Sequence, residues 1–192
     1  DLLEAGQYEY DPDEYHGPTL NYITLIQAWV AGQHKYSEVT EVTLRIVPVV
    51  ASVILIALTV FLIDGLGPGA IVAALLAAIS PAMFFYSRYY VQEMLLVCFT
   101  FGAIVSGYRY ARTKSLAWIV AAGVFAGLMH ATKETCIIAF GCMGLAGAVL
   151  VLLRIRRQGS WRGAFSGVRL GRVVRVLLVA VCVSAVFYSS FF

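Results

Sequence analysis

Long apolar runs separated by very short polar segments constrain this 192-residue chain more than any other feature. A helix needs roughly 20 predominantly apolar residues, with a range of about 17–25, to cross the hydrocarbon core of a bilayer. Each run meets or nearly meets that length, and the connections DGLG, SRYYVQE, RTKS and TKE are too short to contain a soluble domain. We therefore predict membrane helices at about 46–63, 68–86, 94–111, 116–131, 135–153 and 173–192.

The composition agrees with a chain whose main solvent is lipid. Hydrophobic residues make up 60% of the sequence, charged residues make up 13%, and the mean hydropathy is +0.82. Soluble domains are about half apolar and about a quarter charged. These values exclude a soluble globular domain, a disordered tail and a disulfide-stapled secreted module. The predicted fold class is all-α, a polytopic transmembrane helix bundle. The four cysteines lie in apolar runs without CxxC spacing and indicate neither a metal site nor a redox site.

Residues 18–31 form a shorter apolar stretch that we predict to lie in the membrane interface. As a helix it would extend about 21 Å, less than the roughly 30 Å hydrocarbon core. Asn21, Thr24 and Gln27 recur every three residues and can share a polar stripe. The chain starts without an initiator Met or a signal peptide and stops within an apolar run. We therefore interpret residues 1–192 as part of a larger membrane domain.

The few charged residues are sorted between two sets of connections if the helices alternate in direction. One set, at 1–45, 87–93 and 132–134, carries ten of the 11 acidic residues. The other set comprises 64–67, 109–115 and 154–172. Together with Arg175 at the start of the next helix, it carries ten of the 14 basic residues. Because cytoplasmic loops are enriched in Lys and Arg, the first set is predicted to face outward from a plasma (inner) membrane.

The connection YSRYYVQE at 86–93 carries residue types that suit a lipid-linked or phosphorylated substrate. Arg88 offers a planar fork for phosphate or carboxylate, and Glu93 could act as a base or a metal ligand. Tyr89 and its neighbours could stack on a sugar. The alternative is a boundary loop in which Arg88 snorkels and the tyrosines belong to the aromatic belt. Pro81 is expected to kink the preceding helix.

Two further polar segments are predicted to lie on the same membrane face. Lys133 could bind a phosphate while Glu134 orients it, or these two residues could form a local ion pair in a simple helical turn. His16 precedes a helix start and is either a site residue or a structural histidine. The acidic run before it contains Asp11, Asp13 and Glu14. Ionisable groups near a membrane boundary are costly unless they are paired, solvated or functional.

The basic stretch RIRRQGSWRGAFSGVRLGRVVR at 154–175 superficially suggests nucleic-acid binding. Topology and anionic lipid headgroups account for it better. We therefore predict membrane lipids as partners and no nucleic acid.

Four motifs in order resemble the GT-C superfamily of polytopic glycosyltransferases: YEYDPDEYHGPTLNY (8–22), RIVP (45–48), SPAMFFYSRYYVQE (80–93) and ATKE (131–134). The chain is most similar to a branch related to protein O-mannosyltransferases and lipid A aminoarabinose transferases. Members of that branch are described as family 39 glycosyltransferases or as flippase-activity-associated proteins. The resemblance covers nearly the whole chain. It implies an interfacial helix in the first extracytoplasmic loop. It also implies that pairs of membrane helices bring acidic residues to the same outer face of the membrane.

The resemblance also implies which residues form the site. The family has an Asp-Glu pair after its first membrane helix, and that Asp is the usual candidate base. The matching point lies upstream of Asp1, so we expect the first helix and the pair to be missing here. Glu93 matches the acidic position of the second loop, which in related enzymes faces the active site or a divalent ion, and we predict it as the catalytic residue. The predicted substrate-binding residues are His16, Arg88, Tyr89, Lys133 and Glu134.

The predicted function is transfer of a sugar from a polyprenyl-phosphate-linked donor to a protein, lipid or glycan acceptor outside the cytoplasm. A divalent cation could take part, although the sequence carries no cofactor motif. The alternative is a non-catalytic protein associated with a lipid-linked-sugar flippase, or a transporter. Such a protein would bind the headgroup and need no base. A third alternative is a scaffold bundle in which the clustering of charge is accidental.

Overall fold

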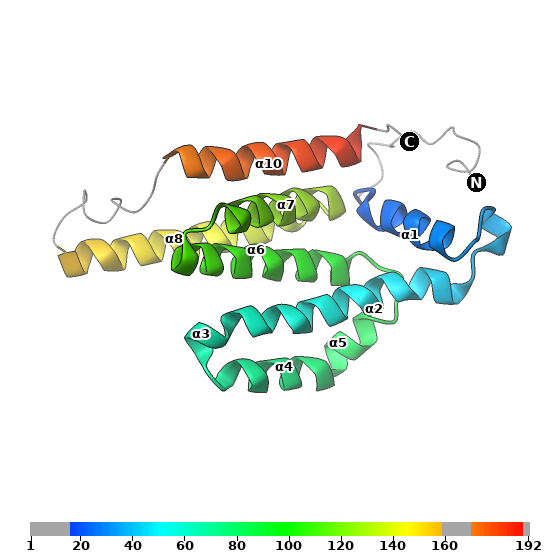
Figure 1. Ribbon diagram of the computed structural model, residues 1–192, viewed down its shortest axis with the longest axis horizontal. Helices are drawn as coiled ribbons and strands as arrows, with labels where there is room; N and C mark the ends of the chain where they lie inside the picture. The colour runs from blue at the N-terminus through cyan, green and yellow to red at the C-terminus, as the bar shows by residue number, and fades with distance from the viewer. Residues whose placement is uncertain (1–15, 159–169, 190–192) are drawn as a thin grey trace.

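A computed structural model describes residues 16–158 and 170–189, which form an all-α bundle (Figure 1). The predicted all-α polytopic fold class is confirmed, because four segments of this part of the chain are helical, long and apolar enough to cross a membrane. They are Glu41–Leu66, Glu93–Thr113, Cys136–Arg157 and Gly171–Tyr188. Two shorter helices, Gly69–Ile79 and Leu116–Thr132, are also apolar.

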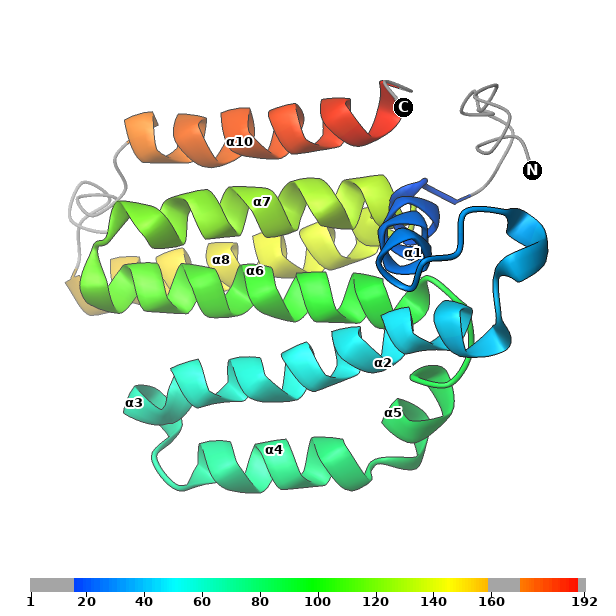
Figure 2. The ribbon, with the colours of Figure 1, turned by 45° about the vertical axis from the view of Figure 1, so that its right-hand side comes forward.

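The helices overlap the apolar runs and follow them in chain order. The long helices run side by side, and the first helix lies across one end of them (Figure 2). The α-helices are α1 (Thr19–Val30), α2 (Glu41–Leu58), α3 (Ile63–Leu66), α4 (Gly69–Ile79), α5 (Pro81–Tyr86), α6 (Glu93–Thr113), α7 (Leu116–Thr132), α8 (Cys136–Gln158) and α10 (Leu170–Tyr188). There are also two 3-10 helices. The first, η1 (Tyr36–Glu38), precedes α2, and the second, η2 (Thr59–Leu62), joins α2 to α3.

The run at 68–86 forms two helices instead of one continuous helix. Ser80 has an extended backbone with φ −62° and ψ 124°, and Pro81 starts α5. A residue before proline is disfavoured in the helical region, and proline has no N–H to continue the helix. The 11-residue α4 is therefore about 16 Å long, well short of a bilayer core.

The buried core joins α1, α2 and α6. It consists of Leu20, Val47, Ala51, Leu55, Met94, Leu95 and Cys98. Thr40 caps the start of α2 by accepting a hydrogen bond from the Thr43 N–H at 3.3 Å. Pro48 lies within α2 and is fully buried, as is allowed when packing compensates for the lost backbone hydrogen bond. The core therefore fixes α1 against the start of α6.

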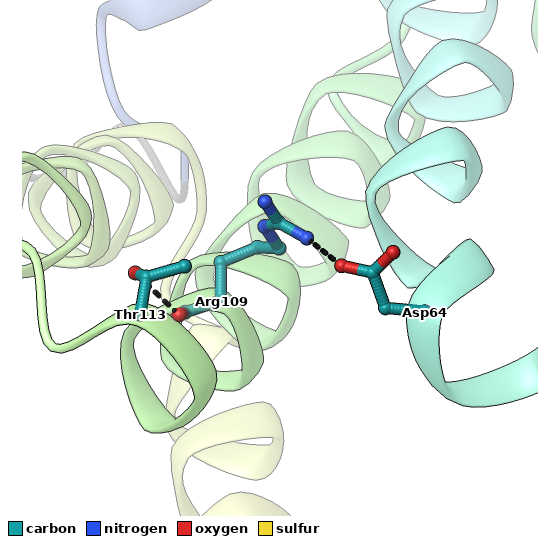
Figure 3. A network of polar contacts seen from close by, with 3 residues as sticks. All are labelled: Asp64, Arg109 and Thr113. Carbon is teal, nitrogen blue, oxygen red and sulfur yellow. Dashed lines mark hydrogen bonds and ion pairs between the residues drawn. The ribbon is translucent and has the colours of Figure 1, made fainter.

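An ion pair ties the far end of α6 to α3. Arg109 on α6 donates to the carboxylate of Asp64, and Thr113 Oγ1 donates to the Arg109 carbonyl oxygen at 2.8 Å (Figure 3). The guanidinium also lies 5.7 Å from the ring centroid of Trp118 on α7. Among the described residues, Asp64 is the one acid at this end of the bundle, and Arg109 gives it a defined partner.

Two glycines of α7 allow α10 to pack closely against it. A Cβ on Gly127 would lie 2.6 Å from the carbonyl oxygen of Ala180, and a Cβ on Gly123 would lie 2.7 Å from Cβ of Val179. Small residues at such contacts let membrane helices approach closely. The α7–α10 pair is therefore held mainly by close backbone packing.

We expect Gly127→Leu to lower the melting temperature of the detergent-solubilised protein by about 5 °C, since overpacking typically costs about 2 kcal/mol. The matched control is Gly141→Leu on α8, where nothing lies within 4 Å of the added Cβ. Intrinsic fluorescence during a thermal ramp measures both variants. Equal shifts in the two variants would show that the α7–α10 contact contributes no special stability.

Candidate functional site

Three segments far apart in the sequence meet at one end of the bundle. The Gly17 N–H donates to the carbonyl oxygen of Thr132 at 3.1 Å, and Thr19 Oγ1 donates to the Ala131 carbonyl oxygen at 2.7 Å. Gln92 Nε2 donates to the Gly17 carbonyl oxygen at 3.1 Å. These bonds attach the start of α1 both to the end of α7 and to the start of α6. They build the polar end of the bundle that the charge pattern predicted.

Gly17 is required where the first segment reaches the end of α7. A Cβ at this position would lie 1.9 Å from the carbonyl oxygen of Ala131, closer than atoms can approach without displacement. The absence of a side chain lets the backbone of His16 pair with that of Lys133 in an isolated antiparallel bridge. His16 and Lys133 are therefore placed side by side by main-chain bonds.

Lys133 and Glu93 form the central ion pair of this site. Lys133 leaves α7 in an extended conformation, and its Nζ lies 2.5 Å from Oε1 of Glu93, the first residue of α6. The Lys133 side chain is 17% exposed, whereas that of Glu93 is 41% exposed. His16 also interacts electrostatically with Glu93. The structure thus brings together three predicted site residues, with the carboxylate more accessible than the ammonium.

The other predicted site residues lie nearby in the sequence but have different neighbours. Arg88 is exposed, and its guanidinium lies 3.9 Å from the ring centroid of Phe84. Tyr89 is also exposed and stacks on Phe85 with 4.5 Å between ring centroids. Glu134 is exposed in the turn before α8. The carboxylate that pairs with Lys133 belongs to Glu93, so the alternative of a local Lys133–Glu134 ion pair is not what forms; the pair instead joins the end of α7 to the start of α6.

Tyr90 and Gln92 support the site, although neither was among the predicted site residues. Tyr90 donates to Thr24 Oγ1 at 2.9 Å, and its hydroxyl lies 3.5 Å from Asn21 Oδ1. Burial raises the pKa of the Tyr90 hydroxyl, which therefore stays a neutral donor. The polar stripe predicted on α1 is thus turned partly toward the connection before α6. In the sequence, this stripe could have indicated these hydrogen bonds, because polar side chains on an otherwise apolar helix need partners.

The acidic run that contains Asp11, Asp13 and Glu14 lies outside the described residues. Within 16–158 and 170–189, no group of three His, Cys, Asp or Glu side chains could hold a metal ion. The Glu93 carboxylate instead binds an ammonium group. The described residues alone therefore do not fit a divalent cation. His130 hydrogen-bonds Ser184 Oγ at 2.7 Å, which joins α7 to α10.

The fold and this end of the bundle define a polytopic membrane protein with a charged site held between helix ends. Residues 16–185 match the family described as dolichyl-phosphate-mannose-protein mannosyltransferase. Because this match covers most of the chain, the chain belongs to that family, which lies in the GT-C superfamily of membrane glycosyltransferases. A search among curated proteins finds no match. The predicted family is thereby confirmed.

Proposed function

We propose that the protein transfers a sugar from a polyprenyl-phosphate-linked donor to a protein, lipid or glycan acceptor outside the cytoplasm. Membership of a membrane glycosyltransferase family supports sugar transfer from a lipid-linked donor. The observation that carries the proposal is the ion pair between Lys133 and Glu93, with His16 bridged to Lys133 at the same end of the bundle. Ionisable groups grouped in this way at a membrane boundary are typical of a functional site.

The two halves of the ion pair suit the two ends of the reaction. The leaving lipid phosphate needs positive charge, which the Lys133 ammonium supplies. The hydroxyl that receives the sugar must lose its proton as the new bond forms. The more exposed Glu93 carboxylate accepts a hydrogen bond from this hydroxyl, orients it and takes its proton as the general base. His16 lies beside both groups and adds a polar contact for the substrate.

The remaining residues extend the binding surface toward the membrane. Arg88 offers its guanidinium fork to the donor phosphate. Its position over Phe84 holds the fork while leaving it exposed. Tyr89 presents an aromatic face for the sugar, and Glu134 contacts a polar part of the substrate. All three side chains are exposed, so a substrate can reach them.

The charge distribution supports an outward-facing site in the plasma (inner) membrane. The opposite end of the described bundle is strongly basic. It includes Arg109, Arg112, Lys114, Arg154, Arg156, Arg157, Arg172 and Arg175. By the positive-inside rule that end faces the cytoplasm, so the Lys133–Glu93 end faces the other side.

The test is transfer of a labelled sugar from its polyprenyl phosphate by the full-length protein. We expect Glu93→Gln to lower kcat by about 100-fold, as for loss of a positioned general base, and Arg88→Ala to raise the donor KM by about tenfold. Asp64→Asn is the matched control, since it makes the same carboxylate-to-amide change in an ion pair with α6 at the opposite end. Its turnover should stay near that of the wild type.

Unchanged turnover in both Glu93→Gln and Arg88→Ala would remove this site assignment. The non-catalytic alternative predicts a distinct pattern of binding without transfer. In that case the wild type binds the labelled donor, and transfers no sugar to any acceptor class, while Arg88→Ala weakens binding and Glu93→Gln does not.

A further inference from the structure

A positively charged cavity lies at the opposite end of the bundle from the Lys133–Glu93 pair. It has a volume of about 410 Å³ and is lined by Lys114, Leu116, Gly171, Arg172 and Arg175. Lys114 directly follows α6, Leu116 starts α7, and the other three residues belong to the first turns of α10. The cavity is therefore built from two chain segments that the fold brings together.

The three cations of this cavity have no carboxylate partner among the described residues, in contrast to the three cations that form ion pairs elsewhere in the bundle. Arg45, Arg109 and Lys133 are paired with Glu41, Asp64 and Glu93, respectively. In the described part of the chain, Lys114, Arg172 and Arg175 form no salt bridge, and no acidic residue lines the cavity. Like charges gathered in one cavity repel each other and attract an anion to the site.

The cations are also positioned by their surroundings. Lys114 Nζ and Arg172 Cζ lie 5.6 and 5.5 Å from the centroid of the same Tyr110 ring, within the range of cation–π attraction. Lys114 adopts the left-handed conformation with φ 57°, which a residue with a side chain adopts at some cost. That conformation turns the chain between α6 and α7 so that Lys114 lines the cavity.

Apolar surface borders the cavity on the same helices. Leu116 is 57% exposed, and Val173, Val174 and Leu177 follow on α10 with 43%, 43% and 59% of their surface exposed. A ligand that combines a phosphate with acyl chains would use both kinds of surface, whereas a free phosphate would use the cations alone. The phosphate would accept hydrogen bonds from the guanidinium groups of Arg172 and Arg175.

We infer that this cavity binds the phosphate of an anionic lipid headgroup, with the acyl chains along the adjoining apolar faces of α7 and α10. The site is separate from the proposed transfer site and does not depend on it. Its role is to hold an anionic lipid at the junction of α6, α7 and α10. Uniform attraction of lipid by a basic surface would not require these three residues in particular.

The test counts lipids bound to the full-length protein by native mass spectrometry during titration with dioleoyl phosphatidylglycerol. We expect the triple variant Lys114→Gln, Arg172→Gln, Arg175→Gln to weaken binding at least about tenfold. The matched control is Arg154→Gln, Arg156→Gln, Arg157→Gln near the end of α8, which removes the same charge outside the cavity. It should change binding less than about twofold.

Two further arms complete the test. Soluble glycerol phosphate should displace bound phosphatidylglycerol poorly. If it displaced the lipid as well as an equal concentration of unlabelled phosphatidylglycerol does, the assignment to a lipid would be overturned. The single variant Arg175→Gln should weaken binding severalfold with an unchanged melting temperature, because Arg175 is exposed. The site would be overturned if the two triple variants lost lipid binding equally. It would also be overturned if the Lys114, Arg172 and Arg175 triple variant and Arg175→Gln both bound lipid as well as the wild type.

Discussion

Replacing Lys133 with methionine should lower kcat/KM for sugar transfer by about 100-fold. The variant keeps the length of the buried stem but removes the ammonium group within 2.5 Å of Glu93. It deprives the donor phosphate of a charge-assisted contact and leaves the carboxylate without its partner, two losses that together amount to about 3 kcal/mol. Steady-state transfer from a labelled polyprenyl-phosphate sugar measures the effect.

Two companion variants separate charge from geometry at this position. Lys133→Arg keeps the charge and should retain much more activity than Lys133→Met. The double variant with Glu93→Gln should lose less activity than the two single losses combined, because each residue acts on the other. Strictly additive losses would mean that Lys133 and Glu93 work independently, and a fully active Lys133→Met would remove Lys133 from the site.

Gly17→Ala should disrupt the polar end of the bundle and lower transfer at least tenfold. The added Cβ would lie 1.9 Å from the Ala131 carbonyl oxygen, so the segment must move. That movement breaks the bonds to Thr132 and Gln92 and separates His16 from Lys133. The expected local cost is about 3 kcal/mol, from overpacking and unpaired buried polar groups.

Hydrogen exchange of the amides at 17–24 is the direct measurement, since it reports local opening of this segment. Protection there should fall, while protection in α8 should not change. Gly107→Ala on α6 is the control, because nothing lies within 4 Å of its added Cβ. Undiminished protection at 17–24 in Gly17→Ala would show that the close approach to Ala131 is not needed.

The helices could be predicted from the sequence because each apolar run must satisfy its own backbone hydrogen bonds in lipid. The two charged ends of the bundle could be predicted because the scarce charges follow the alternation of the helices. The structure accordingly places His16, Glu93 and Lys133 together. It also breaks the run at 68–86 before Pro81, where a kink was expected.

The specific partners could not be predicted because they depend on tertiary contacts. Lys133 is adjacent to Glu134 in the sequence, yet the extended backbone at the end of α7 directs its side chain toward Glu93, 40 residues away in the sequence. The role of Gly17 depends on the approach of a carbonyl group more than 100 residues later. The support given by Gln92 arises in the same way, from the docking of α1.

The hydrogen bond from Thr19 to Ala131 joins residues 112 positions apart, and this separation imposes an order on biogenesis. A ribosome adds roughly 5–20 residues per second, so several seconds pass between synthesis of α1 and synthesis of the end of α7. During that interval α1 lacks its α7 partner. Chains arrested before residue 131 therefore cannot assemble the charged site, whatever fraction of their helices has entered the membrane.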